Sequence, residues 1–279
     1  MHNKETIFYL EGRGGMYLFH FFVYNLGGLY YILNEDYNNR SNDSVAFEDK
    51  SKIVIKPTNS ISFPIKIHMK NILPFQREAF EIIKEKFILI EDLSKIENYE
   101  IVSIYGETLR NRLVTGDNSE KILPFLRDLF IEKCNYEMIN GKRIFITRKN
   151  SDIYHQGVSK RNILNESKMK DMLQKYDFEF IQLEDYSCLE KVKLFMESEI
   201  ILSTHSGALT FTLFANTNAK IIEILKKGTI DGGFDHSHYI NIAKYIELNY
   251  NRYSNICEDS NGNFEINVEE FENYLLTLL

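Results

Sequence analysis

The stretch FEFIQLEDYSCLEKVKLFMESEIILSTHSGALTFTLFA, residues 178–215, decides the fold class. Residues 178–183 and 199–203 are short continuous apolar runs, as expected for strands that are covered on both faces. Between them, residues 187–198 begin with a serine and predict a helix. The order strand, helix, strand is typical of a parallel sheet.

The same alternation continues on both sides of this stretch. Residues 142–148 (KRIFITR) and 219–225 (AKIIEIL) predict further strands, and residues 165–176 predict a helix with Asn165 as its N-cap. Strands that alternate with helices in this way predict an α/β fold with a doubly wound parallel sheet. Such a sheet binds ligands beyond the carboxyl ends of its strands, so we expect a ligand beside the residues that follow these strands.

The first half of the chain alternates strand and helix less regularly. Short β-branched runs at 52–57 and 61–69 predict strands, residues 74–87 predict an amphipathic helix, and the apolar run 99–106 follows. The longer apolar segment 16–33 is rich in aromatic residues and is interrupted by polar residues and a glycine pair. This composition favours a buried helix over a membrane span.

The boundary between the two halves is predicted near a turn at Asn140 and Gly141. We therefore expect two lobes, over residues 1–138 and 139–260. A strongly amphipathic terminal helix is predicted within 261–279. The sequence leaves open whether this helix packs on its own lobe or back on the N-terminal lobe.

Composition and charge argue against some classes of function. The net charge of -7 argues against non-specific binding to nucleic acid or to anionic membranes, both of which need basic surfaces. The three cysteines are Cys134, Cys188 and Cys257. They are few and far apart in the sequence, which predicts free thiols in a reducing compartment. The first apolar run is too short for a signal peptide or an anchor, so we expect a cytoplasmic protein.

The loop STHSGALT, residues 203–210, has three interpretations. A nucleophilic serine is disfavoured, because Ser206 has Thr204 and Ala208 where the pattern G-x-S-x-G requires glycines. A phosphate cradle fits better, since a turn of small residues that opens a helix presents free backbone N–H groups. The third interpretation is an ordinary helix start that is capped by Ser206.

The segment DGGFDHSHY, residues 231–239, has a metal-binding interpretation. Asp231, Asp235, His236 and His238 lie close together in this segment, and two histidines on a loop can bind a metal ion. Such residues more often precede and cap a helix, here the helix predicted after them. We therefore expect no metal site.

An ordered series of segments resembles the conserved block of glycosyltransferase family 61. The segments of the series, in chain order, are ITRK (146–149), RNILNE (161–166), the stretch 178–215 and KIIEI (220–224). Upstream, GGMYLFHFFVYNL (14–26) is similar to the family's N-Y-x-H-W segment, with His20 at the histidine position. The sequence departs from the family pattern at Phe21, where tryptophan is usual, and at Ser206, which separates His205 from Gly207.

The resemblance implies a GT-B architecture of two Rossmann-like lobes with a cleft between them. Residues 1–138 would then form the N-terminal acceptor-binding lobe, and residues 139–260 the C-terminal nucleotide-sugar-binding lobe. It also implies inverting transfer without a metal ion, so basic side chains and a helix N-terminus must neutralise the leaving diphosphate. The family's donor-binding positions correspond here to Arg148, Lys149, Arg161, His205, Ser206, Gly207, Ala208 and Glu223. His20 is the implied general base.

Several of these residues keep a second interpretation. Arg161 either binds the diphosphate or holds the loop before the next helix, and Ser206 either binds phosphate or caps a helix. Glu223 either binds the ribose hydroxyls or forms an ion pair with a nearby lysine such as Lys226 or Lys227. His20 is either the base or a buried histidine of an aromatic helix.

The sequence therefore predicts an enzyme that transfers a sugar, xylose as the first candidate, from a UDP-sugar to a hydroxyl of a glycan or glycoprotein. No cofactor beyond the donor substrate is expected, and neither nucleic acid nor a membrane span. One alternative is a non-catalytic, transferase-like protein that binds a glycan or a nucleotide. A less favoured alternative is a metal-dependent hydrolase that uses Asp235, His236 and His238.

Overall fold

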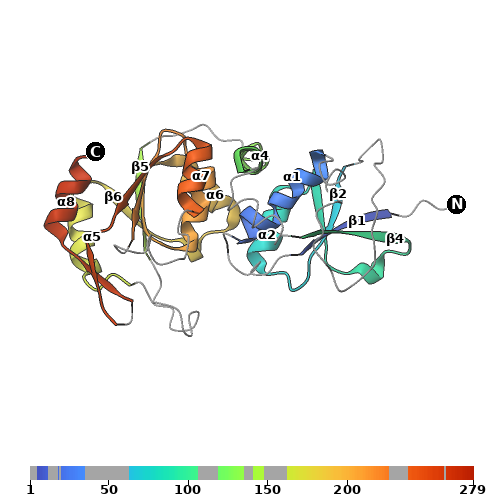
Figure 1. Ribbon diagram of the computed structural model, residues 1–279, viewed down its shortest axis with the longest axis horizontal. Coiled ribbons are helices and arrows are strands. Elements are labelled where there is room, and N and C mark those ends of the chain that lie inside the picture. Colours follow the sequence, from blue (N-terminus) through green and yellow to red (C-terminus); the bar gives the residue numbers. More distant parts are fainter. Residues whose placement is uncertain are drawn as a thin grey trace, which may run out of the picture. The chain divides into compact units, whose positions relative to one another are not determined.

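The computed structural model describes residues 5–11, 18, 20–34, 63–105, 119–134, 141–147, 162–225, 238–260 and 262–279. The chain divides into two compact units, Met1–Lys133 and Cys134–Leu279. Each unit contains a parallel sheet with helices, so the predicted α/β class with parallel sheets is confirmed (Figure 1). The strand predicted at 52–57 lies outside the described residues.

The N-terminal unit has a four-stranded sheet whose strands are all parallel. Its elements are β1 (Glu5–Glu11), η1 (His20–Asn25), α1 (Gly27–Asn34), β2 (Ile65–His68), α2 (Pro74–Ile82), β3 (Phe87–Ile90), η3 (Leu93–Lys95), β4 (Tyr99–Tyr105) and α4 (Ser119–Ile131). The strand order is β3-β2-β1-β4, so the direction in which strands are added reverses between β1 and β4. In open α/β sheets, ligands bind at the carboxyl ends of the strands beside such a reversal.

The apolar segment predicted as one buried helix forms two, the π-helix η1 and the α-helix α1. The π-helical spacing is seen where the Leu26 N–H donates to the Phe21 carbonyl oxygen, five residues earlier, at 2.9 Å. Phe21 packs edge-on against Phe75 of α2, and Phe22 packs against Phe130 of α4. Within the part of the chain that the structure describes, no helix is long and apolar enough to cross a membrane.

The C-terminal unit has a five-stranded parallel sheet of order β6-β5-β7-β8-β9. Its elements are β5 (Lys142–Thr147), α5 (Glu166–Gln174), β6 (Phe178–Gln182), η4 (Leu183–Asp185), α6 (Cys188–Glu197), β7 (Ser198–Thr204), η5 (Gly207–Phe214), β8 (Lys220–Ile224), α7 (His238–Ile246), β9 (Asn249–Tyr253), β10 (Ile256–Glu258), β11 (Phe264–Ile266) and α8 (Val268–Leu276). In this flavodoxin-like order, the reversal falls between β5 and β7. The loop that follows β7 is therefore beside the expected ligand position.

The last helix, α8, packs within the C-terminal unit, where it lies beside α5 (Figure 1). Its Phe271 and Leu275 are fully buried in a core that also contains Phe145 of β5 and Tyr253 of β9. The antiparallel pair β10–β11 leads into this helix.

Asn165 corrects one detail of the prediction, because its side chain does not cap α5. Its Nδ2 donates to the Ile266 carbonyl oxygen at 2.7 Å, and its Oδ1 accepts from the Ile266 N–H at 3.2 Å. The amide thus pairs with the backbone of β11, which lies 101 residues later in the chain. This exchange of two hydrogen bonds fixes the start of α5 to the C-terminal hairpin.

Candidate functional site

The loop after β7 lies at the carboxyl edge of the C-terminal sheet, beside the reversal of strand order. β7 ends at Thr204, and the 3₁₀ helix η5 begins at Gly207, so His205 and Ser206 alone form the connection. The His205 N–H donates to the Ile224 carbonyl oxygen at 3.0 Å, which ties the loop to the end of β8. The apolar strand runs place this loop on the rim, as the sequence predicts.

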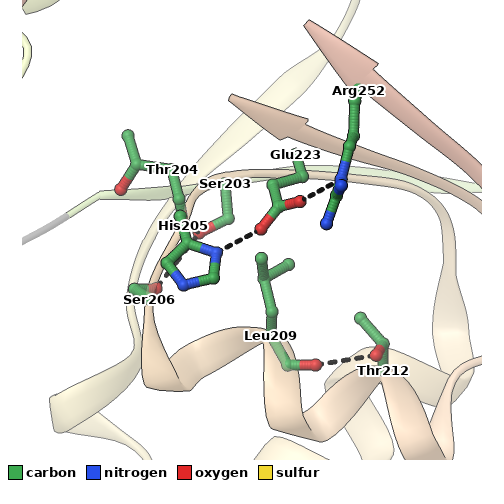
Figure 2. Close-up of polar contacts among 8 residues, drawn as sticks. All are labelled: Ser203, Thr204, His205, Ser206, Leu209, Thr212, Glu223 and Arg252. Carbon is green, nitrogen blue, oxygen red and sulfur yellow. Dashed lines mark hydrogen bonds and ion pairs between the residues drawn. The ribbon is translucent and has the colours of Figure 1, made fainter. Parts of the chain in front are cut away.

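The His205 side chain is held by a buried carboxylate (Figure 2). The distance between His205 Nδ1 and Glu223 Oε1 is 2.5 Å, and Arg252 Nε donates to Glu223 Oε2 at 2.9 Å. The Glu223 side chain has no exposed surface, whereas those of His205 and Arg252 are 12% and 18% exposed. Both oxygens of the carboxylate are therefore engaged by side chains of neighbouring segments.

The electrostatics of this network keep Glu223 ionised. Burial by itself raises the pKa of the Glu223 carboxyl, but the hydrogen bond and charge of His205 and the charge of Arg252 outweigh burial. The net effect is a pKa below the ordinary value of a glutamate. Because an ionised carboxylate only accepts hydrogen bonds, the proton between Glu223 and His205 belongs to Nδ1. The hydrogen bond to Glu223 thus fixes the orientation of the His205 ring.

Two tyrosines complete the surroundings of the network. The ring of Tyr239, at the start of α7, lies 5.2 Å from the His205 ring, measured between centroids. Burial raises the pKa of the Tyr250 phenol far above its ordinary value, and the nearby charge of Glu223 adds to this effect. The Tyr250 phenol is therefore neutral, and the guanidinium of Arg252 is the permanent cation that faces Glu223.

The residues that open η5 are Ser206, Gly207 and Ala208. Ser206 occupies the N-cap position, but its hydroxyl makes no capping hydrogen bond, and its Oγ lies 3.5 Å from Ser203 Oγ. Gly207 is exposed and Ala208 is half-buried. The first N–H groups of this helix have no partner in a preceding turn, as at any helix start. The capping interpretation of the Ser206 side chain is thus not what the structure shows.

His20 lies in the N-terminal unit, as the first residue of η1. Its ring is half-buried and its centroid lies 5.2 Å from that of Tyr24, four residues later. The π-helix is surrounded by aromatic side chains of α2 and α4, so His20 occupies an aromatic helix as the sequence predicts.

Comparison with protein families gives one match, to the family described as Glycosyltransferase 61, over residues 19–222. The matched range covers well over half of the 279 residues and includes η1, β7 and η5. The chain belongs to glycosyltransferase family 61. Membership implies glycosyltransferase activity, with a donor and an acceptor substrate. The resemblance found in the sequence is thereby confirmed, and a comparison with curated proteins gives no match.

Three of the basic residues predicted to bind the donor of this family 61 protein lie outside the described residues. They are Arg148, Lys149 and Arg161. Arg148 directly follows Thr147, the last residue of β5, and β5 and β7 are the strands between which the order reverses. Lys226 and Lys227, the predicted partners of Glu223, also lie outside.

Most of the residues of the alternative metal site lie outside the part of the chain that the structure describes. Asp231, Asp235 and His236 lie outside the described ranges, while His238 is the first residue of α7. Among the described residues, no group of three or more His, Cys, Asp or Glu side chains could hold a metal ion.

Sequence reasoning missed Arg252, although it is the residue that completes the network around Glu223. Arg252 lies in NYNRY, the polar segment that forms the edge strand β9, and nothing in its composition predicted a strand. The register pairs Glu223 with Arg252 across β8 and β9. The usable signal was a glutamate within an apolar strand run, KIIEI, because a buried carboxylate calls for a cation on a neighbouring segment.

Proposed function

We propose that this family 61 protein transfers a sugar, xylose as the first candidate, from a UDP-sugar to a hydroxyl of a glycan, with inversion and without a metal ion. The two units are proposed to be the two lobes of a GT-B enzyme. The observation that carries the proposal is His205, which is held by a buried ion pair beside the start of η5, at the reversal of strand order. This is where an α/β sheet binds a nucleotide or its phosphates.

The donor diphosphate is proposed to lie against His205 and the first N–H groups of η5. A metal-free site must neutralise the leaving diphosphate with cations and backbone dipoles. Glu223 and Arg252 cancel each other in charge, so a protonated His205 adds one positive charge at the loop. Arg148, Lys149 and Arg161 are proposed to supply the remaining positive charge.

The resemblance implies that Glu223 contacts the ribose, but its contacts in the structure favour a different role. Both of its oxygens are bound to side chains of the protein, and the side chain has no exposed surface. We therefore propose that Glu223 positions His205 and Arg252. The acceptor hydroxyl needs a base as it attacks the anomeric carbon, and the resemblance implies His20 of the N-terminal unit as one candidate for this role.

Isothermal calorimetry with UDP tests the proposal, first in EDTA and then in excess Mg²⁺. We expect binding of equal affinity in both, and a loss of about 10- to 100-fold in the His205→Ala variant, because a charge-assisted hydrogen bond to phosphate is removed. Lys168→Ala, which removes an exposed cation from α5, is the matched control and should bind as the wild type does.

Each outcome has a defined meaning. The absence of UDP binding in both conditions overturns the proposal, and binding that requires Mg²⁺ overturns metal independence. UDP binding without UDP release from UDP-xylose, UDP-N-acetylglucosamine or UDP-arabinofuranose supports the non-catalytic alternative. The sugar that gives the fastest release identifies the donor.

A further inference from the structure

A second histidine lies at the carboxyl edge of the N-terminal sheet. His68 is the last residue of β2, and its ring packs against that of Tyr9 of β1, with 5.6 Å between the centroids and 30° between the planes. The Lys70 Nζ lies 5.7 Å from the centroid of the same tyrosine ring. Below, these three residues are called the Tyr9–His68–Lys70 cluster.

One hydrogen bond fixes which nitrogen of His68 carries the proton. Nδ1 lies 2.7 Å from the carbonyl oxygen of Ile90, the last residue of β3. A carbonyl oxygen only accepts, so Nδ1 is the donor. In the neutral imidazole, Nε2 then carries the free lone pair. Within the described part of the chain, Nε2 has no hydrogen-bond partner, and the side chain is half-buried.

The cluster lies beside the reversal of strand order in its sheet. Tyr9 is in register with His68 on one side and with Ser103 of β4 on the other side. The order reverses between β1 and β4, and a ligand is expected at the carboxyl ends of these strands. The lone pair of His68 Nε2 is therefore on the edge of the N-terminal unit where a substrate is expected.

The surroundings of the His20 ring differ from those of the His68 ring. His20 begins a π-helix within a layer of aromatic side chains, and its Nδ1 is buried. His68 is on the end of a strand, and the bond to Ile90 holds its ring in one orientation. A general base needs a fixed ring and a lone pair that the substrate can reach.

We propose that His68, rather than His20, removes the proton from the acceptor hydroxyl. This proposal rests on the proposed transfer from a UDP-sugar. The hydroxyl oxygen attacks the anomeric carbon while its proton passes to His68 Nε2. The bond from the anomeric carbon to the UDP oxygen breaks, and UDP leaves with the electron pair. The imidazolium that results returns its proton to solvent.

The His68→Asn variant tests the role with little change to the fold. The Asn Nδ2 stands near the position of the His Nδ1 and can still donate to the Ile90 carbonyl, but the variant has no atom at Nε2. The probe is UDP release from UDP-xylose with water as the acceptor, or from UDP-N-acetylglucosamine if the wild type hydrolyses it faster. We expect kcat to fall about 10²- to 10⁴-fold, with an unchanged Kd for UDP and an unchanged melting temperature.

The matched control is Lys95→Asn, which removes an exposed cation of the same unit and should retain kcat within about threefold of the wild type. His20→Asn tests the competing base, and we expect it to lose less activity than His68→Asn. A further variant, His68→Ala, leaves space for free imidazole, and added imidazole should restore part of the lost rate. Wild-type turnover in His68→Asn, or a loss confined to His20→Asn, overturns the proposal. Failure of imidazole rescue also overturns it. If the wild type does not bind UDP, the proposed function has failed, and this proposal fails with it.

Discussion

His205 and His68 both lie at the carboxyl edge of a parallel sheet, yet their partners differ in charge. His205 donates Nδ1–H to the Glu223 carboxylate, which is fully buried and also bound by Arg252. His68 donates Nδ1–H to the neutral carbonyl of Ile90. In both rings the hydrogen bond at Nδ1 fixes the orientation of the imidazole.

The difference shows how the hydrogen-bond partner at Nδ1 can suit two histidines to different roles. An anionic partner suits an imidazolium, whose Nε2–H can donate to a diphosphate. A neutral partner suits an imidazole, whose Nε2 can accept a proton. The partner behind the ring, rather than the histidine itself, separates the proposed donor-binding role of His205 from the proposed base role of His68.

The largest effect on stability is expected from removing the buried carboxylate of Glu223. Glu223→Ala leaves Arg252 and His205 without their counter-ion in a largely buried place, so we expect the free energy of unfolding to fall by about 3–5 kcal/mol. Urea denaturation measures the change. Glu179→Ala on β6 removes an exposed carboxylate and should change stability by about 0.5 kcal/mol or less. A small effect of Glu223→Ala contradicts the network.

Acid is expected to weaken the network around Glu223 but not the hydrogen bond between His68 and Ile90. Burial raises the pKa of Glu223, but His205 and Arg252 outweigh it, so the folded pKa lies below the unfolded one. The stabilisation is then complete above the unfolded pKa of about 4.3 and is lost as the pH falls through the folded pKa. Urea denaturation from pH 7 to pH 3 should show a larger loss in the wild type than in Glu223→Gln. His68→Asn should keep the wild-type loss, because its partner does not titrate, and equal losses in wild type and Glu223→Gln contradict the assignment.

The smallest expected effect concerns the ring that packs against His68. Tyr9→Leu removes an aromatic contact worth about 0.5–1.5 kcal/mol and loosens the imidazole. We expect a modest drop in kcat for UDP release and an unchanged Kd for UDP. Lys70→Met keeps the ring pair and serves as the control, with a smaller drop. A change in the Kd for UDP in Tyr9→Leu contradicts the separation of the two histidines.

The fold of the C-terminal unit was largely predictable because its strands are apolar runs that alternate with amphipathic helices. The strand β9 was not predictable in this way, since it is an edge strand of polar residues. Arg252 was missed with it, because its partnership with Glu223 depends on the register of two strands that are far apart in the chain. The predicted lysine partners of Glu223 are sequence neighbours, and a local pattern does not identify a distant partner.

The candidate site was predictable only in part for the same reason. His205 was singled out because a loop of small polar residues follows an apolar strand. His68 lies in a run that predicts a strand, but no motif surrounds it. Its chemical character comes from the carbonyl of Ile90, 22 residues later, which only the pairing of β2 with β3 brings near. Tautomers are set by tertiary contacts, and sequence patterns do not report them.

The pairing of Asn165 with Ile266 has a consequence for the timing of biosynthesis. The start of α5 cannot find its partner until 101 further residues have been translated. At about 5–20 residues per second, the ribosome needs roughly 5–20 s for this length. The N-terminal unit has left the ribosome by then, while the C-terminal sheet still lacks the side chains of α8 that complete its core. During this interval the nascent C-terminal unit exposes apolar core residues that α8 covers once it has been translated.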